Sequence, residues 1–285
     1  MSTVEEVQAG KPPAAPKAGR TNPRRRAPVV VVVPALLGLL FLVLPLAGLV
    51  VRAPWTTLPD RLTEPGVLTA LRLSLQTATI TTLLCLLVGV PLAWLLARTE
   101  FRGRQLVRAL ITVPMVMPPV VGGVALLLVF GRRGVLGSWL DSAFGITLPF
   151  TTTAVVMAQS FVAMPFLVIA VEGALRGADT RYEEAAATLG ASRWTTFRRV
   201  TLPLVAPGVA AGAVLCWARA LGEFGATITF AGNFPGRTQT MPVAVYLALE
   251  TDLEAAIVLS LILLVVSVVI LASLRDKWLT GASAA

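Results

Sequence analysis

Long runs of apolar side chains without a single charge dominate this sequence of 285 residues. A helix that crosses a membrane needs about 20 predominantly apolar residues, because the hydrocarbon core is about 30 Å thick. Five runs meet this condition, at 29–51, 73–97, 109–131, 151–171 and 255–274. A sixth, roughly 204–230, is apolar except for Arg219 and Glu223. The pattern predicts an all-α membrane protein with six transmembrane helices.

The composition supports a membrane protein and excludes several kinds of chemistry. Apolar residues make up 56% of the chain and charged residues 14%, against about 45–50% and about 25% in soluble proteins. The chain has no histidine, which excludes histidine-based acid–base catalysis and histidine metal ligands. Cys85 and Cys216 both lie inside apolar runs, so they predict neither a disulfide nor a metal site. We therefore expect no catalytic residue and no metal site.

The positive charges indicate how the chain is oriented. The net charge is +9, and 17 of the 24 Lys and Arg fall in segments that are cytoplasmic if the N-terminus is inside, against 5 in the outer segments. Cytoplasmic loops carry an excess of Lys and Arg, so we predict that both termini are cytoplasmic. The basic patches are therefore interpreted as a topology signal, and no nucleic-acid partner is expected.

Four regions follow from these spans. Residues 1–28, rich in Pro, Ala and Gly, are predicted to be a disordered basic cytoplasmic tail. Residues 29–66 hold the first transmembrane helix and an outer loop. Its apolar run of 23 residues exceeds the roughly 7–15 of a signal peptide, so we expect it to stay uncleaved. Residues 67–275 form the main transmembrane domain, and 276–285 form a C-terminal tail.

Two spans carry small or cyclic residues that shape helices in lipid. Pro114, Pro118 and Pro119 each remove a backbone donor from the third span. We expect this span to be kinked and to face other helices, which can satisfy the freed carbonyls. In the fifth span, Gly208 and Gly212 have the spacing that lets two helices pack closely.

Arg219 and Glu223 are the charges placed well inside a predicted span. Four residues apart, they share one face of a helix, and Thr227 continues that face. A charge at mid-membrane costs about 2.5–3.5 kcal/mol on translocon scales, so such residues usually face a bundle interior or a polar path. Two interpretations stay open. The pair fixes the packing, within the chain or across a dimer, or these three residues line the translocation path of a polar solute.

The segment between the fourth and fifth spans predicts an elbow outside the membrane. Its sequence favours a short amphipathic helix near 182–189, a turn at Gly190 and a second helix from about Ser192. An elbow of this kind can protrude and dock into the groove of a partner.

The spacing within this segment resembles the EAA loop of ABC importer permeases. The family pattern reads E-A-A-x3-G-x9-I-x-L-P, and Val200 is here a mild substitution for Ile. The matching residues are Glu184, Ala185, Ala186, Gly190, Val200, Leu202 and Pro203. The resemblance covers about residues 68–275. It implies the type I importer permease fold, a homodimer, a cytoplasmic coupling-helix loop that docks on a partner ATPase, and an extracytoplasmic oxyanion-binding protein.

The resemblance also assigns ATP to the partner. The sequence has no G-x-x-x-x-G-K-[ST] pattern, so the chain is not expected to bind and hydrolyse ATP by that route. ATP and Mg are expected on the ATPase, no cofactor is expected on this chain, and the chain is not expected to be an enzyme. Its expected place is a bacterial-type cytoplasmic membrane, in contact with lipid.

A stretch from Arg219 to Pro242 looks like the molybdate/tungstate branch of these permeases. It reads R-A-L-G-E-F-G-A and then G-N-F-P-G-R-T-Q-T-M-P, and M-V-M-P-P-V-V-G in the third span also fits. Sulfate/thiosulfate permeases share the first core but usually diverge after G-N, so they are the alternative. A proton-coupled secondary anion transporter is a more distant alternative, because it predicts titratable residues in several spans.

Four polar residues lie just outside the fifth span. They are candidates for an outer gate or a contact with the binding protein, and ordinary loop residues are an equally weighted alternative. They are Asn233, Arg237, Thr238 and Gln239.

Overall fold

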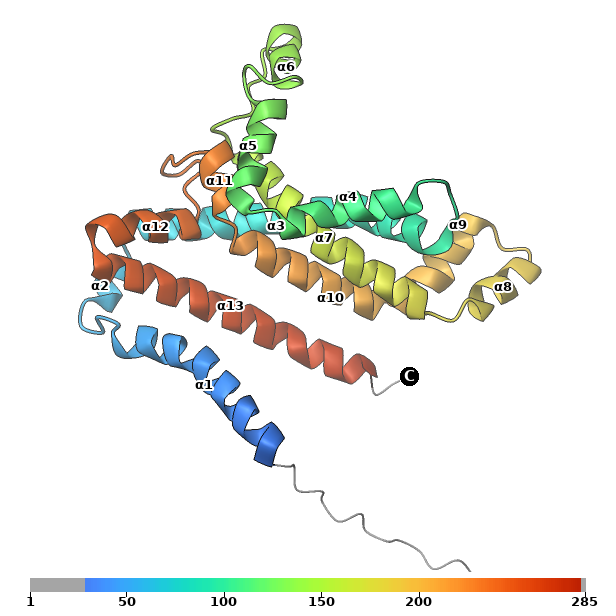
Figure 1. Cartoon of the computed structure of the whole chain (residues 1–285), viewed down its shortest axis with the longest axis horizontal. Helices are drawn as coiled ribbons and strands as arrows, with labels where there is room; N and C mark the ends of the chain where they lie inside the picture. The colour runs from blue at the N-terminus through green and yellow to red at the C-terminus, as the bar shows by residue number, and fades with distance from the viewer. Residues whose placement is uncertain (1–28, 283–285) are drawn as a thin grey trace, which may run out of the picture. The chain divides into compact units, whose positions relative to one another are not determined.

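The computed structural model describes residues 29–282, and all regular structure in that range is helical (Figure 1). The tail predicted at 1–28 lies outside the described residues. The chain divides after Ala47 into two units. The first unit holds most of α1 (Val29–Val51), which matches the first predicted span at both ends. Its 22-residue span has a mean hydropathy of 2.8, as a membrane helix requires.

The second unit begins at Gly48 and contains the remaining helices. Five of them are α2 (Leu58–Leu62), α3 (Pro65–Arg98), α4 (Arg104–Val116), α5 (Pro119–Phe130) and α6 (Gly137–Phe144). They are followed by α7 (Thr152–Gly177), α8 (Arg181–Thr188), α9 (Arg193–Thr196) and a π-helical turn, η1 (Phe197–Thr201). The chain closes with α10 (Leu202–Leu221), α11 (Gly225–Phe230), α12 (Met241–Thr251) and α13 (Leu253–Ala282).

The predicted six spans are present once a bent pair is counted as one. In residues 29–282, five helices are long and apolar enough to cross a membrane, and the pair α4 and α5 supplies the sixth. These two helices meet at an angle of 117°, where Met117 and Pro118 adopt extended backbone. The proline-induced kink predicted for the third span is therefore confirmed.

The fifth span is not the continuous helix that its hydropathy predicts. The helix ends at Leu221, and a new one, α11, starts at Gly225. Thus Arg219 lies on α10, Glu223 lies in the break, and Thr227 lies on α11. The expectation that one helical face carries all three is wrong. The last span also differs slightly, because α13 continues to Ala282, past the predicted end at 274.

Helices α3, α7 and α10 pack side by side to form the main core (Figure 1). Buried side chains of all three fill it, among them Leu96, Leu167, Leu175 and Cys216. A Cβ atom added at Gly208 would collide with the Cβ of Ala174, and one added at Gly212 would lie 3.1 Å from the Cβ of Ala170. The two glycines therefore let α10 approach α7 closely, as their spacing predicts.

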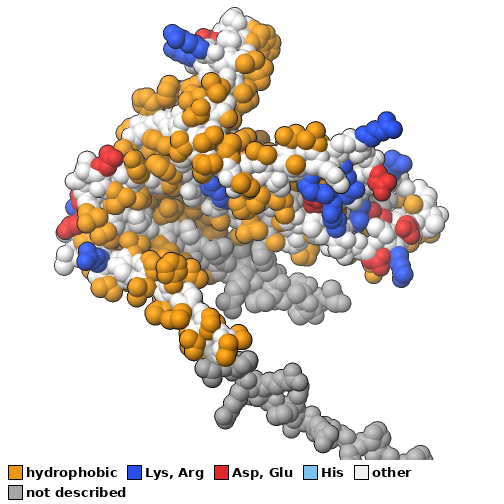
Figure 2. Space-filling model, viewed as in Figure 1, with side chains coloured by type: hydrophobic (Ala, Val, Ile, Leu, Met, Phe, Trp, Pro, Cys, Tyr) orange, Lys and Arg blue, Asp and Glu red, His pale blue; other side chains and the backbone are white. Residues whose placement is uncertain are grey.

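The surface separates apolar from charged regions. Figure 2 shows hydrophobic side chains along the helices, whereas blue and red side chains gather at the end that carries α8 and α9, at the end near α2 and α12, and at the tip near α6. Charges at both ends of an apolar belt are the arrangement that a bilayer imposes on a spanning bundle.

Candidate functional site

The elbow that the sequence predicts between the fourth and fifth spans is present. Helix α8 ends at Thr188, and Gly190 adopts the left-handed conformation with φ of +80°. Ser192 then caps α9, and its hydroxyl accepts a hydrogen bond of 3.2 Å from the backbone N–H of Thr195. The side chain of Leu189 is 87% exposed, so the tip of the elbow presents an apolar residue that nothing in the described chain covers.

The motif residues occupy defined places along this elbow. Glu184 lies exposed in the first turn of α8, where the helix dipole favours a carboxylate. Ala185 and Ala186 follow it on the same helix. The second half of the motif begins α10: Val200 lies in η1, and Leu202 and Pro203 form the first turn of α10.

Glu183, which the motif omits, is the residue that ties the elbow to the bundle. Its carboxylate lies 2.9 Å from a guanidinium nitrogen of Arg98, the last residue of α3. Both side chains are largely buried, at 21% and 12% exposed, so this pair is shielded from solvent better than a surface ion pair. Charges at the end of the second span and at the start of α8 are visible in the sequence, but nothing local pairs Arg98 with Glu183, which lies 85 residues away.

A second cluster missed by sequence reasoning joins α7 to α4. Glu172 is 6% exposed, and its Oε1 atom lies 2.5 Å from Arg108 and 2.8 Å from Arg176. Arg176 is one turn further along α7, whereas Arg108 comes from α4. A buried carboxylate with two arginines is well compensated, so this cluster fixes the ends of two spans against each other.

The charged pair in the fifth span is joined directly. A guanidinium nitrogen of Arg219 lies 2.7 Å from Oε2 of Glu223. The other oxygen, Oε1, accepts a hydrogen bond of 2.8 Å from the backbone N–H of Ala226, in the first turn of α11. Glu223 is 1% exposed and the Arg219 side chain 26%, so the carboxylate is enclosed while the cation keeps a route to the surface.

Thr227 follows this pair in sequence, but its side chain does not bond to either residue. Its side chain is fully buried, and its hydroxyl has no hydrogen-bond partner in the described part of the chain. A buried hydroxyl without a partner is unfavourable by about 1–3 kcal/mol.

The two broken spans meet at their breaks. A Cβ atom at Gly225, where α11 begins, would lie 3.0 Å from Pro119 and 3.1 Å from the N atom of Val120, where α5 begins. A Cβ at Gly123 would similarly lie 3.0 Å from the carbonyl oxygen of Ala226. Irregular backbone at membrane depth is tolerated where it is buried in protein or lines a water-filled cavity. At the junction of α5 and α11, both breaks are packed against protein.

The four outer candidates belong to the loop between α11 and α12. Thr238 is fully buried, and its hydroxyl accepts a hydrogen bond of 2.9 Å from the N–H of Phe234. The hydroxyl of Thr152, at the start of α7, donates to the carbonyl of Arg237 over 2.9 Å. Arg237 itself is exposed, while Asn233 and Gln239 are half-buried. Within residues 29–282, no hydrogen bond or ion pair joins these four to Arg219 or Glu223. Thr238 therefore stabilises the loop from inside, and Arg237 is the charged residue that the loop exposes to solvent.

The described residues contain no group of three Cys, Asp, Glu or His side chains placed to hold a metal ion.

The model of the family "Binding-protein-dependent transport system inner membrane component" matches residues 89–281. The chain belongs to this family. The matched region runs from the second half of α3 through α13, so it includes the elbow, both broken spans and the outer loop. The chain is thus a multi-pass component of the cytoplasmic membrane.

Individual permeases resemble the chain over most of its length. It is 49% identical to the molybdenum transport system permease protein ModB of Mycobacterium tuberculosis, over 87% of this chain and 94% of that protein. It is 36% identical to the sulfate transport system permease protein CysT of Escherichia coli, over 83% of this chain and 86% of that protein. Its fold matches a bacterial ABC transporter that imports alginate, with a TM-score of 0.71 at 17% identity over 87% of this chain and 93% of that one.

Proposed function

We propose that this chain is the membrane-spanning permease subunit of an ATP-driven importer of molybdate or tungstate. The observation that carries the proposal is the 49% identity to a molybdenum permease across 87% of the chain. Identity to the sulfate permease is lower, at 36% over a similar length. Sulfate or thiosulfate therefore remains the competing substrate that an experiment must separate from molybdate.

The elbow is proposed to be the coupling loop and to face the cytoplasm, together with both termini. Leu189 at its tip and Tyr182 on α8 are 87% and 59% exposed, as expected of apolar side chains that enter a groove of another subunit. The partner would be an ATPase subunit, which binds ATP and Mg. This chain would contribute no catalytic residue and would bind no cofactor.

The Arg98–Glu183 pair supports a mechanical role for this elbow. A force applied to α8 reaches α3 through that pair, and it reaches α10 directly through α9 and η1. ATP-driven closure of the ATPase would thereby move the ends of two spans together. Binding energy at the elbow can bias the permease between two conformations only if its contacts differ between them.

The path is proposed to lie between two copies of this chain, related by a two-fold axis. Six spans with one polar region form half of such a pore, and a homodimer would complete it. The partly exposed guanidinium of Arg219 offers positive potential to a passing oxyanion, while Glu223 limits how tightly that anion is held. Thr227 is the uncharged candidate for contact with the solute.

The opposite end of the bundle is proposed to receive an extracytoplasmic oxyanion-binding protein. Arg237 would contact such a protein or act as a gate, and its exposure on a loop that is tied to α7 supports this role. This assignment follows from the orientation, because the loop between α11 and α12 lies at the other end of α10 from the elbow.

Deletion of the gene tests the substrate in cells. Cellular molybdenum would be measured by mass spectrometry after growth with trace molybdate and ample sulfate. We expect a large fall that is restored by the gene or by excess molybdate. Unchanged molybdenum together with lost growth on sulfate as sole sulfur source would reject molybdate in favour of sulfate.

A further inference from the structure

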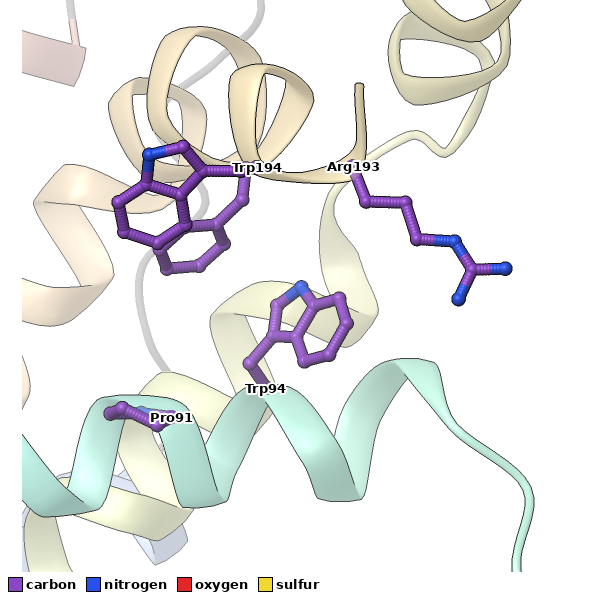
Figure 3. Close-up of a pocket in the computed structure, with 5 residues that line it drawn as sticks. Pro91, Trp94, Arg193 and Trp194 are labelled. Carbon is purple, nitrogen blue, oxygen red and sulfur yellow. The ribbon is translucent and has the colours of Figure 1, made fainter. Parts of the chain in front are cut away.

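A pocket with aromatic walls opens beside the elbow (Figure 3). It has a volume of about 280 Å³ and is lined by Pro91, Trp94, Arg193, Trp194 and Phe197. The ring of Phe197 meets Trp94 edge-on at 6.1 Å between centroids and stacks against Trp194 at 5.8 Å. In Figure 3, Trp94 rises from α3 toward the segment that bears Trp194, and Arg193 extends away on the other side. Four of the five lining residues are apolar, so the pocket suits a hydrocarbon ligand.

A second cavity adjoins this pocket and has charged side chains in its lining. It has a volume of about 320 Å³, shares Trp94, Arg193 and Phe197 with the first, and adds Arg98 and Glu183. One nitrogen of Arg98 pairs with Glu183, but its Nε atom is buried without a hydrogen-bond partner in the described part of the chain. The lining of this cavity thus contains two arginines and one carboxylate, which gives it a formal net positive charge.

The two cavities lie at different depths along α3. Pro91 precedes Arg98 by seven residues, which corresponds to about 10 Å at 1.5 Å per residue. Pro91 and Trp94 lie inside a charge-free run, whereas Arg98 ends the helix. Along α3, the apolar side chains would therefore lie at the depth of acyl chains and Arg98 at the level of headgroups, where tryptophan is also enriched.

We propose that these connected cavities form a binding site for one anionic phospholipid. Its acyl chain would lie along Pro91, Trp94 and Trp194, and its phosphate would accept hydrogen bonds from Arg193 and from Nε of Arg98. Basic pockets between membrane helices on the cytoplasmic side bind anionic headgroups in this way, and guanidinium groups match phosphate geometry well. The proposal rests on the proposed function only in placing the elbow at the cytoplasmic leaflet.

The purified full-length permease provides the test, by native mass spectrometry with added phosphatidylglycerol or phosphatidylcholine. We expect the permease to retain phosphatidylglycerol in preference to phosphatidylcholine. One arginine near the surface contributes roughly a fivefold change in affinity, so Arg193→Ala should weaken phosphatidylglycerol binding about fivefold. Arg181→Ala is the matched control, because it removes another exposed arginine, on α8, that does not line either cavity.

Further variants keep the test decisive if Arg193→Ala misfolds. Arg193→Lys retains the charge and should keep the lipid preference, whereas Trp194→Ala should weaken the binding of both lipids. Equal retention of the two lipids by the unmodified permease, or equal losses for Arg193→Ala and Arg181→Ala, would overturn the proposal.

The same variants separate this site from other contacts. One outcome is that the Arg193→Ala permease no longer copurifies with the ATPase while its lipid preference is unchanged. In that case the two cavities are a contact for the ATPase, and the lipid site is rejected. Molybdate uptake is an independent measurement. A permease that selects phosphatidylglycerol but moves no molybdate would reject the proposed function and leave the lipid site standing.

Discussion

At the residue scale, Glu223 explains how the fifth span tolerates its break. Its carboxylate satisfies an N–H group at the start of α11 and pairs with Arg219 at the end of α10. The carboxylate therefore caps the start of α11, where a backbone N–H group would otherwise lack a partner, and links that helix to the Arg219 side chain on α10. Sequence reasoning offered either a structural pair or a polar path for these residues, and the ion pair within the chain is now observed.

Removing both members of this pair should cost less than the sum of removing each one alone. Arg219→Ala leaves a carboxylate that is 1% exposed without its cation, and breaking a buried pair in this way costs about 3–5 kcal/mol. We expect the double variant Arg219→Ala, Glu223→Ala to be less destabilised than the sum of the single variants. Unfolding of the detergent-purified protein measures this. Additivity within about 0.5 kcal/mol would contradict direct coupling.

Gly190 should be required for coupling rather than for membrane insertion. Its φ of +80° disfavours any side chain, at roughly 1–2 kcal/mol per residue, although no atom lies near the added Cβ. We expect Gly190→Val to reach the membrane at normal levels but to lose transport. Gly173→Val is the matched control, because that glycine is exposed on a regular helix with open space around it. Normal uptake by Gly190→Val would show that the elbow assignment is wrong.

Asp252 should make stability depend on pH in the acidic range. The N–H of Ala255 and the guanidinium of Arg61, 2.8 Å away, lower the pKa of this carboxyl below its ordinary 3.8. Its contribution is therefore complete above that value and is lost as the pH falls through the lower native pKa. We expect the stability difference between the unmodified protein and Asp252→Asn to shrink below about pH 4. A difference that grows on acidification would contradict this pairing.

At the element scale, the long helices followed from hydropathy, but one of the two breaks did not. Three prolines marked the bend between α4 and α5, because each removes a backbone donor. The stretch Gly222–Phe224 contains no proline, and at its break Glu223 contacts Ala226 and Arg219, three and four residues away. Hydropathy averages over such a local arrangement, so the sequence predicted one continuous helix.

The elbow was predictable only where its sequence signals are local. The turn at Gly190 and the two short helices have such signals, and the structure contains the turn and both helices. The ion pair that anchors the elbow to α3 has no local signal, since Glu183 and Arg98 are 85 residues apart in the chain. The cluster around Glu172 likewise joins α7 to α4, and only the partner within α7 has a recognisable helical spacing.

Close packing of α10 on α7 should depend on Gly208. A side chain there would be forced against Ala174, and overpacking of this kind typically costs about 1–3 kcal/mol. We expect Gly208→Leu to lower the unfolding temperature of the purified protein clearly. Gly173→Leu places the same side chain on exposed α7 surface and should have little effect. Equal effects for both variants would show that helix contact at Gly208 is unimportant.

At the scale of the whole molecule, the second unit combines a rigid bundle with two interrupted spans. The core of α3, α7 and α10 provides rigidity, whereas α5 and α11 bring two breaks together. The elbow lies at one end of this bundle and the Arg237 loop at the other. This distribution suits a protein that receives a solute at one end and a mechanical input at the other.

Transport by the reconstituted complex tests the central claim most directly. The permease would be placed in liposomes with its ATPase partner, and molybdate would be supplied with the binding protein at the face opposite the ATPase. We predict molybdate uptake that requires ATP and persists with sulfate in large excess. Uptake that proceeds without ATP, or sulfate uptake that excess molybdate does not reduce, would contradict this account.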